Sequence, residues 1–435
     1  MERFSGPYRE VCANDLTRNG APLRKPVGLV ARILPLCFAL CALLLLDQAA
    51  RAQTVCEATE HGMRADGSDN VAALSKLLGE CAGRTIHIAH GTYVFRPQGY
   101  AAGLVVPAGT VIVGDGSQGP QQTILQIAET GNFQAFFWIR NVSNVAIRNI
   151  RIDGSTYDSG CARHLDYGHA IYIHSDKDQS AGVNGVELSG DFFHNFNGQS
   201  WVTINAVDQS PGIGLDTPIT IKDNVYDSSA GLTGNCPSAG IGYPTAMLWL
   251  HGSDQSAQGL IKNVIIDSNT FNAAYVKGAI AIWSGTDTID VERNRIGEAG
   301  LMLPPAPGTE LGRYAIMVYN SAHIGAQVLP GLHPDNIRIV GNVITDPVSC
   351  GIYGAAARGL TIVGNRISGQ RDRFDGTLPK GAISLNHVEN VVELDDNELT
   401  NNYIGISAVG SHINMGSNRI TPAPGGKAQK ILLPQ

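Results

Sequence analysis

The sequence predicts an all-β protein that folds as a right-handed parallel β-helix, a solenoid with one short capping helix at its N-terminal side. Three observations predict this fold. A short phrase recurs from about residue 141 onwards, 51 of the 435 residues are glycine, and only 16% are charged, against about 25% in average globular proteins. Many tight turns and few exposed helices explain this composition, and repeats of this kind build solenoids.

The recurring phrase is apolar-x-apolar, two or three residues, Asn, x, apolar, as in Val291–Ile296 and Ile339–Ile344. Successive copies lie 21 to 48 residues apart, which is the range of solenoid repeats. Asparagine tolerates left-handed backbone geometry, and its amide can bond to an asparagine stacked above it. We therefore expect a structural ladder of Asp191, Asn224, Asn269, Asn294, Asn342, Asn365, Asn397 and Asn418.

A second strand follows each phrase, for example Ala170–His174 and Met247–His251. Alternation along these strands directs Ile, Val and Leu inward, and the other residues outward. One outward column is predicted to contain Tyr172, Thr203, Trp249, Ala281, Met317, Tyr353 and Ser384, and the next His174, Asn205, His251, Trp283, Tyr319 and Asn386.

Residues 69–78 carry apolar residues at helical spacing, with Asp69 or Ser68 as the N-cap, and this helix is expected to cover the open N-terminal end of the core. We divide the chain into an N-terminal extension with a signal peptide (1–52), an N-terminal cap with the first coils (53–140), the β-helix repeats (141–421) and a C-terminal tail (422–435).

The apolar run Ile33–Leu46 follows basic residues and precedes Ala50-Arg51-Ala52, which is the order of a secretory signal. We expect cleavage after Ala52 and a secreted or periplasmic protein that has no contact with the membrane after cleavage. The run is shorter than the roughly 20 residues that span a bilayer, and an uncleaved anchor is the alternative. A net charge of −7 argues against a nucleic-acid partner.

Five cysteines follow the predicted cleavage site. In an oxidising compartment the first expected disulfide is Cys56–Cys81, which would staple the cap, and the second is Cys161–Cys236. Cys350 is expected to be buried and outside any disulfide. Their spacing does not indicate a zinc site.

The opening residues 66–74 (DGSDNVAAL), followed by Ile86-His87-Ile88 and Gly91-Thr92-Tyr93, resemble the start of the pectate-lyase-superfamily β-helix proteins. Residues 111–117 (VIVGDGS) resemble the next phrase of that family, and the likeness covers roughly residues 60–420. Asn70 and Ala89-His90 depart from the family pattern. The NTD…DD…GHG…RIK pattern of polygalacturonases, the WiDH phrase of classical pectate lyases and the DPH phrase of mannuronan epimerases are absent. The resemblance implies carbohydrate chemistry without naming a reaction.

The outward columns predict a binding groove, because aromatic faces stack on sugar rings and imidazole or amide groups bond hydroxyls. Adjacent coils lie about 4.8 Å apart, so the second column would run roughly 20 Å. The alternative is that loops fold over this sheet and pack on Trp249 and Trp283. The expected substrate-binding residues are Tyr172, Asn205, Trp249, Trp283 and Tyr319.

The expected catalytic residues are His174, His169, Asp166, Asp176, Asp208, His251 and Arg313. Asp176, Asp208, Asp254 and Asp287 follow the outward column, and stacking would place neighbours about 5 Å apart and alternate ones about 10 Å apart. The first spacing suits a retaining glycosidase and the second is near the inverting range, while the same row is a candidate Ca²⁺ site. A lyase would instead use His169 or His174 as the base, with Arg163 or Arg313 stabilising charge.

The most favoured function is a polysaccharide lyase or glycoside hydrolase acting as a monomer on a polysaccharide or oligosaccharide. The row of aspartates makes Ca²⁺ a candidate cofactor, and no other metal is expected. The alternatives are a non-catalytic glycan-binding or adhesin-type surface protein, and an epimerase or maturation factor for an exopolysaccharide.

Overall fold

The computed structural model describes residues 55–97, 103–128, 134–154, 168–194, 196, 200–228, 246–256, 258–273, 278–300, 313–320, 332–371 and 380–432. All of them belong to the compact unit Thr54–Gln435, and the other unit, Met1–Gln53, lies outside the described residues together with the predicted signal segment. Within the described ranges, no helix is long and apolar enough to cross a bilayer.

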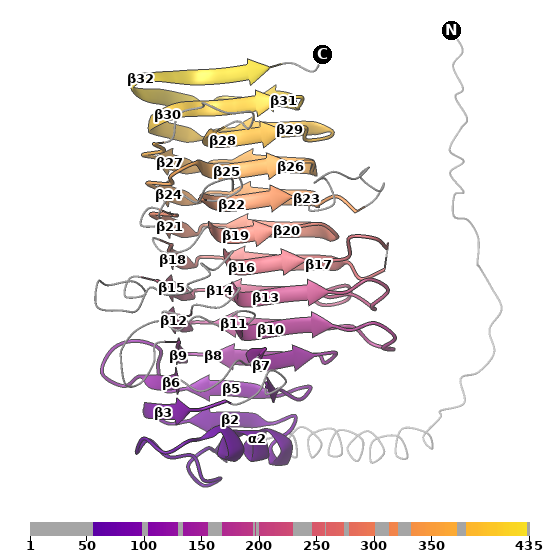
Figure 1. Ribbon diagram of the computed structural model, residues 1–435, viewed down its shortest axis with the longest axis vertical. Helices are drawn as coiled ribbons and strands as arrows, with labels where there is room; N and C mark the ends of the chain where they lie inside the picture. The colour runs from indigo at the N-terminus through magenta and orange to yellow at the C-terminus, as the bar shows by residue number, and fades with distance from the viewer. Residues whose placement is uncertain are drawn as a thin grey trace, which may run out of the picture. The chain divides into compact units, whose positions relative to one another are not determined.

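Parallel strands stack coil upon coil along the unit Thr54–Gln435 (Figure 1). Each full coil contributes one strand to each of three ladders, and every strand pair between described strands is parallel. The prediction of an all-β parallel β-helix is therefore confirmed. The long-strand ladder carries the predicted outward columns, the short-strand ladder follows the asparagine turn, and the third ladder is a sheet of twelve strands.

The twelve-stranded sheet contains β1 (Cys56–Glu57), β2 (Thr85–Ile88), β5 (Val111–Gly114), β8 (Val145–Arg148), β11 (Val186–Ser189), β14 (Ile219–Lys222), β17 (Ile261–Asp267), β20 (Thr286–Glu292), β23 (Asp335–Val340), β26 (Arg358–Val363), β29 (Val391–Asp395) and β31 (His412–Met415). The long-strand ladder contains β4 (Leu104–Val105), β7 (Ala135–Arg140), β10 (His169–Ser175), β13 (Ser200–Ala206), β16 (Ala246–His251), β19 (Gly278–Ile282), β22 (Tyr314–Tyr319), β25 (Cys350–Ala355) and β28 (Gly381–Asn386).

The short-strand ladder contains β3 (Gly91–Phe95), β6 (Thr123–Ile127), β9 (Arg151–Asp153), β12 (Phe192–His194), β15 (Val225–Asp227), β18 (Thr270–Asn272), β21 (Arg295–Gly297), β24 (Val343–Thr345) and β27 (Arg366–Ser368). The long strand β30 (Glu398–Val409) pairs with both β27 and β28, and β32 (Arg419–Leu432) pairs with β30, so these two strands join the two ladders.

The asparagine ladder is confirmed. From Asn224 to Asn397, each side-chain amide donates to the Oδ1 of the next asparagine, at 2.8 to 3.1 Å. The same amide nitrogen donates to a backbone carbonyl of the preceding coil, at 2.8 to 3.0 Å. The ladder is thus structural, because every rung satisfies buried backbone groups of its neighbours.

The left-handed residue of each turn is the one before the asparagine, and not the asparagine itself. Gly341 and Gly364 both have φ near +66° and directly precede Asn342 and Asn365. The ladder asparagines therefore do not use the left-handed geometry that asparagine tolerates. Other residues with positive φ at this position are Gly190, Asp223, Ser268, Arg293 and Asp396.

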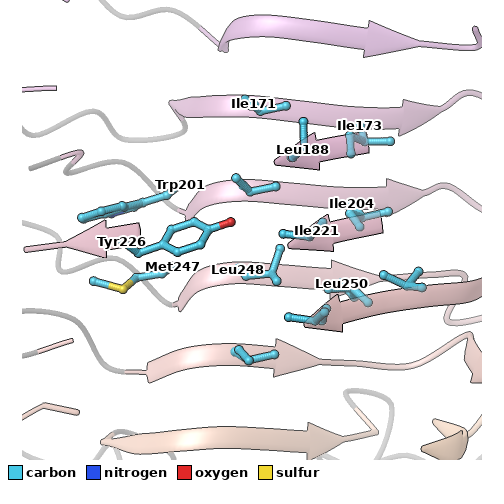
Figure 2. Close-up of a cluster of buried hydrophobic side chains, with 14 of the residues drawn as sticks. Ile171, Ile173, Leu188, Trp201, Ile204, Ile221, Tyr226, Met247, Leu248 and Leu250 are labelled. Atoms are coloured by element: carbon cyan, nitrogen blue, oxygen red, sulfur yellow. The ribbon is translucent and has the colours of Figure 1, made fainter. Parts of the chain in front are cut away.

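The core lies inside the coils and consists of stacked aliphatic columns. Ile171 pairs with Val202, which in turn pairs with Leu248 on the next coil. Figure 2 shows Ile171 and Leu248 together with Leu188 and Ile221 of the twelve-stranded sheet. The ring of Tyr226 stacks between the rings of Phe193 and Phe271, at centroid distances of 4.8 and 4.6 Å. The inward direction of the Ile, Val and Leu residues is therefore confirmed.

The only helix among the described residues is α2 (Val71–Glu80), which lies at the N-terminal end of the described stack beside β2 (Figure 1). Its N-cap is Asn70 rather than Asp69 or Ser68, but the Asn70 side chain makes no capping hydrogen bond because it bonds to the backbone of Arg64 and Val94. The predicted Asp69 instead accepts the Val71 N–H at 3.2 Å. The predicted Cys56–Cys81 disulfide is formed, and it ties β1 to the end of the helix.

The structure also bears on the predictions for the other cysteines and for the C-terminal residues. Cys350 is buried and its sulfur is not part of a disulfide, as predicted. Cys161 and Cys236 lie outside the described residues. Residues 422–435 were assigned to a tail, but β32 continues through Leu432 and pairs with β30, with register shifts between Thr400 and Ile404. No asparagine phrase follows Asn418, so the repeat pattern could not reveal this strand.

Candidate functional site

The outward columns of the long-strand ladder have the register that the sequence predicts. Tyr172 pairs with Thr203, and Thr203 pairs with Trp249 on β16. The column continues in register through Ala281, Met317, Tyr353 and Ser384. The strand positions of these residues follow from the repeat spacing, because one residue recurs per coil at a fixed place.

The second column begins with His174, Asn205 and His251, which pair directly across β10, β13 and β16. Trp283 comes one residue after β19 ends, and its ring contacts the His251 ring at a centroid distance of 5.4 Å. Tyr319 then follows Trp283 at 6.2 Å. The structure therefore brings the predicted residues together on one face.

Two residues of this face were missed by the sequence analysis. Trp138 and Arg140 on β7 pair with Tyr172 and His174. The Arg140 guanidinium lies 4.6 Å from the centre of the Trp138 ring, which in turn stacks near Tyr172 at 6.2 Å. Residues 135–140 (AFFWIR) show the same alternation as residues 170–174. Extending the repeat one coil towards the N-terminus would have found them.

We call the side chains of Trp138, Arg140, Tyr172, His174, Asn205, Trp249, His251 and Trp283 the outer row. Seven of them lie on four consecutive strands of the ladder, β7, β10, β13 and β16. Trp283 directly follows the fifth strand, β19.

His174 is held by a hydrogen bond to Asp176 at the N-terminal part of the outer row. Its Nε2 lies 3.0 Å from Oδ1 of Asp176, and Asp176 accepts hydrogen bonds from Arg140 and Asn141, both at 2.5 Å. Burial would raise the pKa of Asp176, but these hydrogen bonds outweigh it and hold the pKa below its ordinary value. Asp176 is therefore an ionised carboxylate that fixes the orientation of the imidazole.

Burial lowers the pKa of His174 despite the attraction of Asp176, so the ring is neutral near pH 7. A carboxylate only accepts hydrogen bonds, so the proton of the neutral ring resides on Nε2. Nδ1 then carries the lone pair, and it has no hydrogen-bond partner among the described residues. His174 thus has the protonation state of a proton acceptor, while Nδ1 itself is shielded from solvent and the whole residue is only 7% exposed.

His169 differs from His174. It is buried, and its Nδ1 lies 3.2 Å from the Ser200 carbonyl oxygen and 3.0 Å from Thr203 Oγ1. Burial lowers its pKa to about 4. Because these contacts occupy Nδ1 within the packed wall, the described geometry gives His169 a structural role.

The centre of the outer row is a packed set of rings. The Trp249 ring stacks on His251 at 5.3 Å and meets Trp283 edge-on at 4.9 Å. His251 Nε2 lies 2.9 Å from Asp254, and Asn205 accepts a hydrogen bond from the Tyr172 hydroxyl at 3.1 Å. Within the described part of the chain, the indole N–H groups of Trp138, Trp249 and Trp283 have no acceptor.

The C-terminal part of the face is closed by packing. Tyr319 is only 5% exposed and belongs to a second hydrophobic cluster on the outer side of the ladder, against which Trp249 and Trp283 pack. Burial also raises the pKa of Tyr353 in this cluster to about 12. The expectation of one open groove along the whole column was wrong for this part, and Tyr319 has a packing role. The other buried members are Ala246, Ala281, Tyr314, Met317, Cys350, Tyr353 and Ala355.

The four carboxylates do not form the predicted row. Asp208 accepts hydrogen bonds from the Ser253 hydroxyl and the Gln255 backbone, while Asp254 bonds to His251. Asp287 lies on β20 in the twelve-stranded sheet, 2.9 Å from Lys262. In the described ranges, the only three-residue cluster of ligand-type atoms is Cys56, His61 and Cys81, which contains the disulfide. Asp287 is thus removed from the predicted row, and no group of three carboxylates gathers its oxygens closely enough for a metal ion among the described residues.

The remaining predicted residues are not brought to His174. Arg313 directly precedes β22, four strands away from β10 in the ladder, which corresponds to about 19 Å. Asp166, Arg163 and His164 lie outside the described residues.

Comparisons with known proteins establish the fold. No known protein-family profile matches the chain, and no curated protein sequence does. Among solved structures, the surface protein and adhesin PfbA of Streptococcus pneumoniae superposes with a TM-score of 0.55 and 11% identity, covering 87% of this chain and 100% of that one. The A-module of the mannuronan C-5 epimerase AlgE4 from Azotobacter vinelandii gives 0.50 and 12%, covering 88% and 98%.

The tailspike protein of E. coli bacteriophage HK620, solved in complex with a pentasaccharide, gives a TM-score of 0.50 and 11% identity, covering 86% of this chain and 64% of that one. At such identities the likeness shows the fold alone. The chain is a right-handed parallel β-helix, an architecture that hosts several functions, so its activity has to be argued from the site.

Proposed function

We propose that the chain is a secreted or periplasmic carbohydrate-active protein that binds a polysaccharide or oligosaccharide along the outer row. The carrying observation is the run of aromatic and imidazole rings in register from Trp138 to Trp283. Five strands at about 4.8 Å spacing cover roughly 20 Å, a length that accommodates several sugar rings. The partly exposed faces of these rings are suited to stack on the C–H faces of sugar rings.

Proteins of the same fold support the carbohydrate theme. One is named as a mannuronan epimerase, and another was solved with a pentasaccharide. Because one fold hosts many activities, the chemistry of this chain has to come from its own residues.

The activity we propose is that of a polysaccharide lyase or a glycoside hydrolase with His174 as the general base. Nδ1 of the neutral ring accepts a proton, either from a carbon of the sugar in a lyase or from water in a hydrolase, once a displacement of the ring has exposed this buried atom. Asp176 holds the Nε2 proton and stabilises the imidazolium that forms, and Arg140 keeps Asp176 ionised. His174 is thereby oriented on a rigid strand next to Tyr172.

A second function, non-catalytic glycan binding, is favoured by a different observation. The outer row lies against the second hydrophobic cluster, and Asp208 and Asp287 bond to Ser253 and Lys262, so neither of these carboxylates pairs with His174. The comparison with an adhesin of this fold points in the same direction.

One experiment separates the two functions. The purified protein is incubated with a panel of neutral and uronate polysaccharides, with and without Ca²⁺, while absorbance of unsaturated products and reducing ends are recorded. We expect turnover that His174→Ala abolishes and that the matched exposed variant His412→Ala retains. Glycan binding that Trp249→Ala and Trp283→Ala weaken, without any turnover, would instead establish the binding protein. Neither binding nor turnover on the whole panel would refute the proposal.

A further inference from the structure

A second polar feature lies beside the outer row. The turns that follow β10, β13 and β16 line a cavity of about 620 Å³, within the size range of small-ligand sites. Each turn contributes one glutamine: Gln179 and Gln209 lie four residues before the bridged residues Val183 and Ile213, and Gln258 lies three residues before Ile261. We call this space the turn cavity.

The floor of the turn cavity is rigid. The Val183 N–H donates to the Gly212 carbonyl at 3.1 Å, and the Ile213 N–H donates to the Leu260 carbonyl at 2.9 Å. Gly212 has φ of +96°, and a Cβ there would lie only 2.7 Å from the Leu260 oxygen. The three turns stack this closely because glycine occupies the contact, so the cavity is preformed.

A buried hydroxyl in the lining has no partner. Ser210 is 2% exposed, and in the described ranges its Oγ makes no hydrogen bond. Leaving such a group unsatisfied is costly, and a rotation about its Cα–Cβ bond that turns the shielded Oγ towards the cavity would let a ligand hydroxyl satisfy it. The lack of a partner therefore marks Ser210 as a contact for a polar ligand.

The lining also defines the charge of that ligand. Lys262 is the one charged residue of the lining, and its ammonium group is paired with Asp287 at 2.9 Å. Three glutamine amides both donate and accept hydrogen bonds, and Leu215, 43% exposed, adds an apolar wall. This combination matches an uncharged molecule that has many hydroxyl groups and an apolar C–H face.

We propose that the turn cavity is a second carbohydrate site, which binds a neutral di- or trisaccharide unit through the glutamine amides and the Ser210 hydroxyl. Gln179 and Gln209 follow the outer-row residues His174 and Asn205 by five and four residues, so the cavity lies next to the outer row. This proposal depends on the proposed function in one respect, the source of the ligand. The ligand would be a branch or a neighbouring segment of the glycan that the outer row binds.

Isothermal titration with maltotriose, cellotriose, laminaritriose and trigalacturonate tests the site on the full mature chain. We expect binding of at least one neutral trisaccharide, and at least about tenfold weaker binding when Gln179, Gln209 and Gln258 are all replaced by alanine. Ser210→Ala is expected to weaken binding by several-fold. Gln255→Ala is the matched control, because Gln255 is exposed in the same turn but does not line the cavity.

The outcomes distinguish this site from the outer row. Binding that is lost in the triple glutamine variant but unchanged in Trp249→Ala supports the turn cavity, even if the outer row proves inactive. Neutral trisaccharide binding that is lost only in Trp249→Ala overturns the turn cavity and leaves the proposed function in place. Preference for trigalacturonate, or no binding of any trisaccharide by a correctly folded chain, also overturns it.

Discussion

The first rung of the asparagine ladder is an aspartate, and this exception leads to a quantitative prediction. Asp191 is buried, its Oδ1 accepts the Ile150 N–H at 3.0 Å, and its Oδ2 has no hydrogen-bond partner among the described residues. Burial raises the pKa of Asp191 well above its ordinary value, although hydrogen bonds from backbone N–H groups oppose this. We therefore expect Asp191→Asn to stabilise the protein at neutral pH.

The magnitude follows from the neighbouring rung. The Asn224 amide nitrogen makes two hydrogen bonds, to the Leu188 carbonyl at 3.0 Å and to Asn269 Oδ1 at 3.1 Å. Leu188 pairs with Ile147 on β8, so the amide introduced by Asp191→Asn would find the Ile147 carbonyl in the equivalent place, and Asn224 Oδ1 as its second acceptor. Two bonds at about 0.5–1.5 kcal/mol each predict a gain of about 2 kcal/mol in the free energy of unfolding.

The pH dependence gives the sharper test. A carboxyl group whose pKa is raised by folding contributes its full stability below its unfolded pKa of about 4, and this is lost as the pH rises through the folded pKa. A protonated Asp191 can donate only one of these two bonds through its O–H group, so the advantage of Asp191→Asn should be smaller at pH 4 than near pH 8, where the buried carboxyl group also bears the cost of ionisation. With an unfolding entropy of about 2.1 cal/mol/K per residue, 2 kcal/mol raises the Tm of the unit Thr54–Gln435 by roughly 2–3 °C.

Calorimetric melting of both proteins at pH 4, 6 and 8 measures this difference. Asn224→Asp is the matched control, because it places a carboxyl group one rung further on, where both amide bonds exist. It should lower Tm at pH 8 and recover in acid. An equal Tm difference at pH 4 and pH 8, or a lower Tm for Asp191→Asn at neutral pH, would refute the reasoning.

Three further predictions follow from individual groups. If His174 is the base, the apparent pKa on the acid side of the kcat/KM pH profile should lie below the ordinary histidine value of about 6.5, because burial lowers the pKa of His174. An apparent pKa above 6.5 would contradict this. Replacing both Cys56 and Cys81 by serine should destabilise the N-terminal coils by about 3 kcal/mol, measured by local hydrogen exchange, and unchanged protection there would count against the expectation. The exported protein should begin at Gln53 by intact mass, whereas a retained N-terminus would favour the uncleaved anchor.

The solenoid, the register of its outward columns and the asparagine ladder could all be predicted from the order of residues. These features repeat once per coil, so spacing along the chain translates directly into stacking in space. For this reason Tyr172, His174, Asn205 and His251 could be assigned to one face from the sequence, and the strand register agrees. Trp138 and Arg140 could have been predicted in the same way, by extending the repeat one coil towards the N-terminus.

The bonding partners of the polar side chains, and the closed part of the face, emerge only when the coils are assembled. Asp208 turns to Ser253, Asp287 joins the neighbouring sheet, and Tyr319 packs into an outer cluster, since turns of unequal length carry their residues to places that strand periodicity does not define. Burial around His174 and Ser210 is likewise a property of the assembled coils. A repeat specifies where a strand residue points, while the state of its polar atoms depends on contacts between segments far apart in the chain.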